Sequence, residues 1–324
     1  MKLYLLFFAL FFLTCERGAE IVYPSGPTIY FQTTNLLPLN ANEGYYEAWI
    51  SFANPQGMVG QTSTTVDTSF VSIGKFNIDE SGRLIGLDGK LFTARLTKPR
   101  NPQYAIDAVI SIQTWSGQDT LPGSVILGGE FRGDARSGTA DLSTSYREAF
   151  ETDFKNAEGY FLLDAPTSTD PYYDINGIWF MRSVSPDSAG LINLPRLPQG
   201  WVYEGWLTYE AFNYITGPYN ELFPMGKFLY PDSADDDLAG PRKGANGNGY
   251  DFPGQDYVQV TPFGFKPLSV MITIEPAIAG FEFPTLSLKL FEATGINQLS
   301  RRRVPHSMQQ NAANFPTATI TVIR

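Results

Sequence analysis

A short aromatic stretch occurs twice in the chain, and this repetition constrains the fold more than any other feature. Residues 46–50 read Tyr-Glu-Ala-Trp-Ile, and residues 203–207 read Tyr-Glu-Gly-Trp-Leu. Other landmarks keep one order around both copies: a Leu-Pro segment upstream, then a Gly-Lys-Phe triplet, an apolar run and a further proline downstream. We therefore interpret the chain as a tandem duplication of one structural unit.

Local patterns in both units are typical of β-strands. Short runs rich in β-branched and aromatic residues alternate with turn-forming residues. Successive side chains of a strand point to opposite faces, so Tyr46 and Tyr203 are expected to face a core. Trp49 and Trp206 would then lie on the opposite face, covered by a neighbouring element.

Each unit is expected to close with a strand at the same position of the repeat, residues 159–163 in the first and 318–323 in the second. Residues 143–156 contain the best candidate for a helix, with Ser145 as its cap. Many short strands without βαβ alternation indicate antiparallel sandwiches.

The predicted fold class is therefore all-β: two tandem antiparallel β-sandwich domains related by internal duplication, with one short helix. The predicted division is a signal peptide at residues 1–15, a first sandwich at 22–166, a linker at 167–175 and a second sandwich at 176–324. Pro166 precedes this linker and Pro171 lies within it, among small polar residues, and such residues break both helix and strand.

The N-terminus has the pattern of an export signal. After Lys2, residues 3–13 are almost wholly apolar, which is too short for a bilayer span of about 20 residues but suits a signal peptide. Cys15 follows directly, as in a bacterial lipoprotein signal, where the cysteine is acylated. We expect a membrane-anchored lipoprotein of the bacterial cell envelope, attached through this lipid alone; ordinary secretion is the alternative.

Charge and cysteine content narrow the function further. The formal net charge of -10 argues against nucleic acid or an anionic membrane surface as a partner. The chain has one cysteine, which excludes an intramolecular disulfide and a cysteine-based zinc site.

The landmarks resemble the extracytoplasmic β-sandwich domain of the anti-sigma-K-factor type. Its pattern is Tyr-x-x-Trp, then Gly-x-Phe before an acidic turn, then a strand that leads to Glu-Pro. Tyr203 and Trp206, residues 226–228 and Glu275-Pro276 match it, whereas the first unit has Gln113-Thr114 in place of Glu-Pro. The resemblance implies a shared module. Such anti-sigma factors also carry a sigma-binding domain and a membrane helix, which we do not recognise here, so inhibition of a sigma factor is not expected.

Four tryptophans are candidates for a binding surface. Aromatic rings stack on sugars and anchor protein interfaces. The alternative is that these rings belong to a core or to the contact between domains. The four candidates are Trp49, Trp206, Trp179 and Trp201.

An acidic run in the second unit could supply oxygen ligands to Ca²⁺, which takes six to eight of them. Its carboxylates do not follow the EF-hand spacing, and a solvated acidic loop is the alternative. The candidate ligands are Asp232, Asp235, Asp236 and Asp237. No other cofactor is expected.

Catalytic patterns are weak. Glu47 and Glu204 occupy the same place in two separate units, whereas glycoside hydrolysis needs two carboxylates within one site. His306 stands in a polar segment, and the chain has no Gly-x-Ser-x-Gly motif. We expect a non-enzymatic envelope protein that binds another envelope protein or has a structural role; the alternative is a carbohydrate-binding module at the cell surface.

Overall fold

The computed structural model describes residues 27–40, 43–53, 68–115, 120–134, 136–213, 217–259, 266–278, 284–296 and 301–323. These residues form nineteen strands, β1 to β19, and contain no α-helix, which confirms the all-β class. Their helical segments are 3-10 turns of three residues: η2 (Pro102–Tyr104), η3 (Pro171–Tyr173), η4 (Leu286–Leu288) and η5 (Ala312–Asn314).

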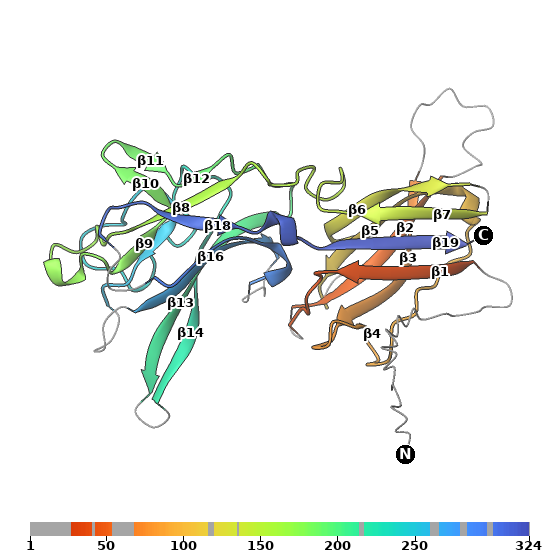
Figure 1. Cartoon of the computed structure of the whole chain (residues 1–324), viewed down its shortest axis with the longest axis horizontal. Coiled ribbons are helices and arrows are strands. Elements are labelled where there is room, and N and C mark those ends of the chain that lie inside the picture. The colour runs from red at the N-terminus through yellow and green to blue at the C-terminus, as the bar shows by residue number, and fades with distance from the viewer. Residues whose placement is uncertain are drawn as a thin grey trace, which may run out of the picture.

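The first sheet is antiparallel and curls into a half-barrel (Figure 1). Its eight described strands define the first unit. In spatial order they are β1 (Thr28–Thr34), β19 (Thr317–Ile323), β7 (Ser137–Leu142), β6 (Ser124–Gly133), β5 (Ala105–Gln113), β2 (Tyr45–Ala53), β3 (Thr68–Ile78) and β4 (Leu84–Gly86).

The second sheet is also antiparallel and forms a nearly closed barrel, which defines the second unit. In spatial order its strands are β14 (Gly217–Phe228), β13 (Trp201–Asn213), β16 (Pro267–Pro276), β17 (Lys289–Thr294), β18 (His306–Gln310), β8 (Glu158–Leu163), β9 (Gly177–Trp179) and β15 (Gly254–Asp256), with β12 (Leu191–Ile192) beside β8. A separate ribbon pairs β10 (Met181–Val184) with β11 (Asp187–Ala189).

The two units exchange their closing strands. The sequence predicts β8 as the last strand of the first unit and β19 as the last strand of the second, and both assignments are wrong. β8 lies between β9 and β18 of the second sheet, and β19 lies between β1 and β7 of the first. The strand orders of the two sheets otherwise correspond, apart from the end strands β4 and β15, so each half of the chain supplies a strand to the sheet of the other half. The sheets therefore do not coincide with the predicted ranges 22–166 and 176–324.

The predicted helix at 143–156 is also wrong, because this stretch consists of turns. The Tyr146 hydroxyl donates to the carboxylate of Asp107, and Arg147 Nη2 donates to the other oxygen of that carboxylate at 2.9 Å. These bonds to a distant strand fix the backbone in a way that local helix propensity cannot, since propensity is a weak preference.

The repeated aromatic stretch lies in β2 and in β13. Tyr46, Ala48 and Ile50 belong to the hydrophobic core, as the strand alternation predicted. The pairing of β2 with β3 has a β-bulge next to Trp49, and the pairing of β13 with β14 has a corresponding β-bulge next to Trp206. The glycine of the Gly-Lys-Phe landmark serves this bulge: Gly74 has a φ of 136° and Gly226 a φ of 94°, which favour glycine.

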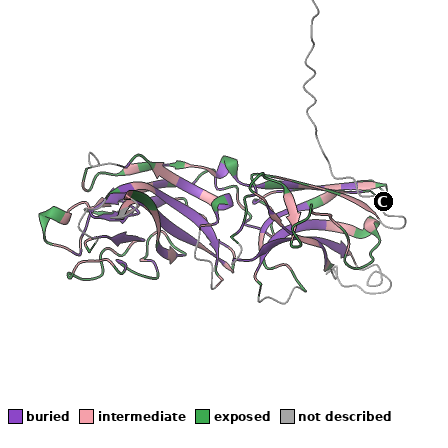
Figure 2. Ribbon diagram, turned by 90° about the horizontal axis from the view of Figure 1, so that it is seen from below, coloured by how far each residue is buried: buried purple, intermediate pink, exposed green. Residues whose placement is uncertain are grey.

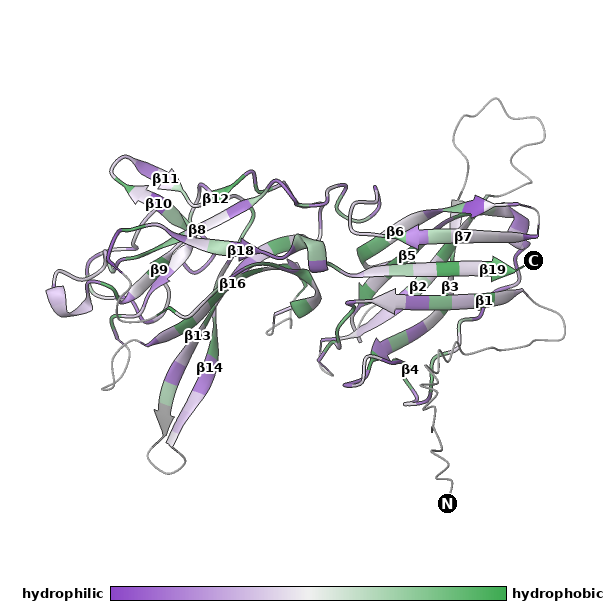
Figure 3. Cartoon of the chain, in the orientation of Figure 1, coloured by the Kyte–Doolittle hydropathy of each residue, from purple (hydrophilic) through white to green (hydrophobic). Residues whose placement is uncertain are grey.

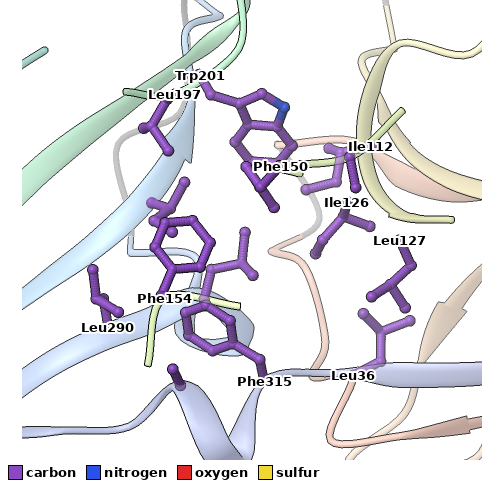
Figure 4. Packing of buried hydrophobic residues seen from close by; sticks show 14 of the residues in the cluster. Leu36, Ile112, Ile126, Leu127, Phe150, Phe154, Leu197, Trp201, Leu290 and Phe315 are labelled. Atoms are coloured by element: carbon purple, nitrogen blue, oxygen red, sulfur yellow. The ribbon is translucent and has the colours of Figure 1, made fainter. Parts of the chain in front are cut away.

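One hydrophobic cluster contains buried residues of both units. Figure 2 shows buried positions along the strands of each unit. The rings of Phe150 and Trp201 meet at 4.8 Å between centroids, and those of Phe154 and Phe315 at 5.5 Å. Figure 4 shows Trp201 above Phe150, close to Ile112 at the end of β5. The units share buried apolar surface and lie end to end along the long axis (Figure 1).

Candidate functional site

The strand β13, its neighbours and the acidic segment after β14 bring together most polar groups that the sequence singles out. The corresponding place in the first unit carries a related set.

Each repeated tryptophan is buried and hydrogen-bonded. Trp49 Nε1 donates to Ser111 Oγ at 3.0 Å, and Trp206 Nε1 donates to Thr273 Oγ1 at 2.8 Å. Both acceptors lie on the adjacent strand, β5 or β16, and are fully buried. The expectation that these rings lie opposite the core face under cover is confirmed.

The hydroxyl group of each repeated tyrosine binds the Leu-Pro segment upstream, which accounts for the recurrence of that landmark. The Tyr46 hydroxyl donates to the carbonyl oxygen of Leu37 at 2.9 Å, and the Tyr203 hydroxyl donates to that of Pro195 at 2.6 Å. The bond fastens the segment that enters each unit to the central strand. These landmarks therefore recur for a structural reason.

The prediction that four tryptophans form a binding surface is wrong. Trp49, Trp206, Trp179 and Trp201 are all at most 3 % exposed. Trp179 Nε1 donates to Asp256 Oδ1 at 2.8 Å, and Trp201 packs between the units. Their rings are core because their indole nitrogens find internal acceptors or their faces meet other aromatic rings.

The acidic run is held against the protein. Asp235 Oδ2 accepts a hydrogen bond from the Gly254 backbone N–H at 2.8 Å, and Asp236 Oδ1 accepts one from the Lys227 backbone N–H at 2.7 Å. Asp232 and Asp237 are exposed. The described residues contain no group of three or more His, Cys, Asp or Glu side chains that could hold a metal ion, so they give no support to the candidate calcium site.

Buried carboxyl groups surround the start of β13. Burial raises the pKa of Glu204 to about 8, although the Lys227 Nζ atom 3.7 Å from its Oε2 opposes the shift. Burial raises the pKa of Glu275 to about 7, against two hydrogen bonds from Thr285. Burial likewise raises the pKa of Asp235. Several of these groups hold a proton at pH values where an exposed carboxyl would be ionised.

A groove with a cavity volume of about 590 Å³ opens beside these carboxyls. Leu229 and Tyr230, just after β14, are 47 % and 46 % exposed at its edge. Its lining combines apolar side chains with one lysine and two aspartates: Val202, Lys227, Phe228, Leu229, Tyr230, Ser233, Ala234, Asp235, Asp236, Ala277 and Ile278.

The first unit fills the equivalent place with aromatic rings. Tyr45 and Trp115 occupy the repeat positions of Val202 and Ala277, and their rings meet at 4.9 Å between centroids. The groove therefore exists where two large side chains are replaced by small ones. Sequence reasoning missed it, although this exchange and the insertion after β14 were readable once the two copies had been aligned.

The remaining candidates have structural surroundings. His306 on β18 stacks on Phe161 of β8, with ring centroids 5.2 Å apart. Glu47 and Glu204 lie in different sheets, each opposite the lysine of its own Gly-Lys-Phe triplet. Cys15 and the predicted signal peptide lie outside the described residues.

Fold and site together define an all-β protein of two strand-exchanged units with one apolar, acid-rimmed groove described on the second unit. No family model, no curated protein and no solved structure matches this chain. Among the described residues, no helix is long and apolar enough to cross a membrane.

Proposed function

We propose that this chain is an exported cell-envelope protein that binds another envelope protein, without catalysis, through the groove beside β13 and β14. The observation that carries the proposal is the pair Leu229 and Tyr230, two large side chains half-exposed at the rim of an apolar groove. Exposed apolar side chains gathered at one concave site are typical of interaction surfaces.

The chemistry of the rim supports a protein segment as the ligand. Lys227 and Asp236 offer charges of both signs beside apolar walls formed by side chains such as Val202 and Ile278. A polar rim around an apolar centre is the usual anatomy of a protein interface.

The bonding of the carboxyl groups supports a non-catalytic role. Both oxygens of Glu275 accept hydrogen bonds from Thr285, and Asp235 Oδ2 is occupied by a backbone N–H. A catalytic carboxyl must reach a proton of the substrate, and these three oxygens already accept hydrogen bonds from the protein.

The proposal also includes export, lipid attachment and a relation to the anti-sigma-K-factor type of domain. Export and lipid attachment rest on residues 3–13 and Cys15, and the relation to the anti-sigma-K-factor type of domain rests on the repeated landmarks. The carbohydrate-binding alternative, which requires exposed aromatic rings, has less support, because the four candidate tryptophans are buried.

The test is a cross-linking pull-down from native envelope membranes with the full chain tagged at its C-terminus. We expect one stoichiometric partner, which is lost with Tyr230→Ser and kept with Tyr172→Ser. Tyr172 is a matched control because it is 74 % exposed and lies outside the groove. Equal recovery with both variants, or no partner at all, would refute the proposal.

A further inference from the structure

The exchange of closing strands shows that each sheet contains a channel that takes a strand from a distant part of the chain. In the first sheet this channel runs between β1 and β7, and β19 fills it. β19 pairs with β1 from Thr317 to Ile323 and with β7 from Ala318 to Ile323. Without β19, two strands would expose unpaired backbone groups, which favours uptake of another strand.

The channel also selects side chains. Ala318, Ile320 and Val322 point into the core and are at most 5 % exposed, whereas Thr317 and Ile323 are exposed. A donor strand must therefore alternate small or β-branched apolar residues with polar ones. Register matters, since a slip by one residue would turn the apolar side chains outward.

The donor β8 is locked in place by ion pairs that follow it. Asp164 is fully buried and accepts hydrogen bonds from Arg302 Nε at 2.6 Å and from Arg303 Nε at 2.9 Å. The Tyr250 hydroxyl also donates to this carboxylate. Breaking one partner of a buried charge pair is strongly unfavourable, so β8 is not readily withdrawn.

β19 is held differently. Its outer face makes hydroxyl hydrogen bonds, between Thr321 and Thr139 at 3.0 Å and from Thr319 to Asp141 at 3.2 Å. These bonds are uncharged or lie at the surface, and water can replace them. Of the two donors, β19 is therefore the one that no ion pair holds in its channel, since residues 317–323 include no charged side chain.

The segment that delivers β19 already points away from the second unit. Residues 311–316 connect β18 in one sheet to β19 in the other. Phe315 has φ -59° and ψ 151°, an extended conformation, and Pro316 follows it. The residue before a proline prefers extended geometry, so the sequence favours an extended backbone at the point where the chain enters β19.

We propose that the channel between β1 and β7 is a strand-acceptor site for a second copy of this chain, so that β19 of one molecule can complete the first sheet of another. Exchange of identical elements between protomers is a low-cost route to assembly, because every native contact is kept. The intramolecular strand competes at an effective concentration in the millimolar range, so linked molecules form when chains refold together at high concentration.

The test uses two full-length chains in a Cys15→Ser background, one with Gln32→Cys and a size tag, the other with Thr319→Cys. Gln32 and Thr319 are register partners on the outer face of β1 and β19. A disulfide between the two chains at these positions then reports a strand donated from one molecule to the other. The chains are unfolded, mixed, refolded at increasing concentration and analysed on a non-reducing gel.

The control mixes an Arg132→Cys chain with a Thr139→Cys chain. These residues are register partners in the β6–β7 hairpin, which each molecule completes from its own adjacent strands. We expect the hetero-linked species to exceed the control several-fold, to rise with concentration and to disappear when Ile320→Asp is added to the donor. Hetero-linking no greater than the control at any concentration would overturn the proposal, and so would hetero-linking that Ile320→Asp leaves unchanged.

Discussion

At the scale of single residues, the two copies of the aromatic stretch share the same internal hydrogen bonds and do not form a binding surface. A buried hydroxyl on the adjacent strand accepts a hydrogen bond from each repeated indole nitrogen. The acceptor is Ser111 in one unit and Thr273 in the other, so the hydroxyl is kept while the residue changes. The sequence could predict that the tryptophans lie opposite the core under cover, but not which elements cover them, because those elements come from distant parts of the chain.

Replacing Trp49 by Phe should lower the free energy of unfolding by about 1 to 3 kcal/mol, since it leaves the buried Ser111 hydroxyl without its donor. Urea unfolding measures this loss. Adding Ser111→Ala should recover part of it, because the two side chains form one interaction. The matched control is Trp115→Phe, at an exposed ring, which we expect to change stability by less than about 0.5 kcal/mol.

Glu204 should make stability depend on pH. Its pKa is raised from 4.5 to about 8 in the folded state, so between these values the folded chain keeps a proton that the unfolded chain has lost. Stability therefore falls as the pH rises from 4.5 to 8. Glu204→Gln should reduce this fall by on the order of 5 kcal/mol, since one pKa unit corresponds to about 1.4 kcal/mol and the pKa rises from 4.5 to about 8.

Thermal unfolding at half-unit pH intervals tests this expectation. The control is Glu210→Gln on the same strand, where the side chain is 38 % exposed and pairs with Lys266 at the surface. A pH profile of Glu204→Gln that runs parallel to the wild-type profile would show that this carboxyl does not carry the effect.

At the scale of elements, strand patterns predict where strands occur but not which sheet they join. The patterns of β8 and β19 correctly indicated strands at matching places of the repeat. The strands that fill the two channels have similar lengths, six residues in β8 and seven in β19, so their length does not tell which sheet each one joins. Contacts with residues far away in the sequence determine which sheet each strand joins. Among them are the hydrogen bonds from Arg302 and Arg303 to Asp164, next to β8.

The exchange predicts that a substitution late in the chain damages the first sheet. Ile320→Ala should cost about 2 to 5 kcal/mol through the cavity that it creates. Hydrogen exchange should show the largest loss of protection in β1 and β7, which flank β19, and little change in β13 and β14. Thr317→Ala, at an exposed position of the same strand, is the control. Loss of protection concentrated in β17 and β18 would contradict the exchanged topology.

The β13–β14 hairpin is a second element whose form follows from its residues. Its distal part is largely hydrophilic (Figure 3) and extends beyond the sheet. Near the sheet, the same strands carry Trp206 and Met225 in buried positions. The groove lies at this buried end, so its walls are positioned by the best-packed part of the hairpin.

At the scale of the whole molecule, the two units are coupled through one core. Trp201 of the second unit packs on Phe150, and Phe315 in the crossover packs on Phe154 (Figure 4). The sequence indicated two units but not their shared core. Phe150 and Phe154 stood in the stretch expected to be a helix, and Phe315 had no pattern that distinguished it from an ordinary loop residue.

This coupling predicts a single unfolding transition for the wild-type chain. Trp201→Ala should remove about 3 to 5 kcal/mol and, because the ring lies between the units, split the calorimetric transition into two. Tyr172→Ala, at an exposed ring, should leave one transition at the wild-type temperature. A single transition that only shifts to lower temperature in Trp201→Ala would mean that the exchanged strands, rather than the aromatic contact, couple the units.

The exchanged strands also determine how the molecule would respond to a pulling force. β19 runs along the long axis and enters the first sheet from the side of the second unit (Figure 1). Hydrogen bonds between antiparallel strands are perpendicular to the strands. A force that draws the units apart would therefore act in shear on all backbone hydrogen bonds of β19 at once. It would not break them one after another. Two sheets that exchange strands in this way would therefore resist separation under tension far better than two independent domains joined only by a linker.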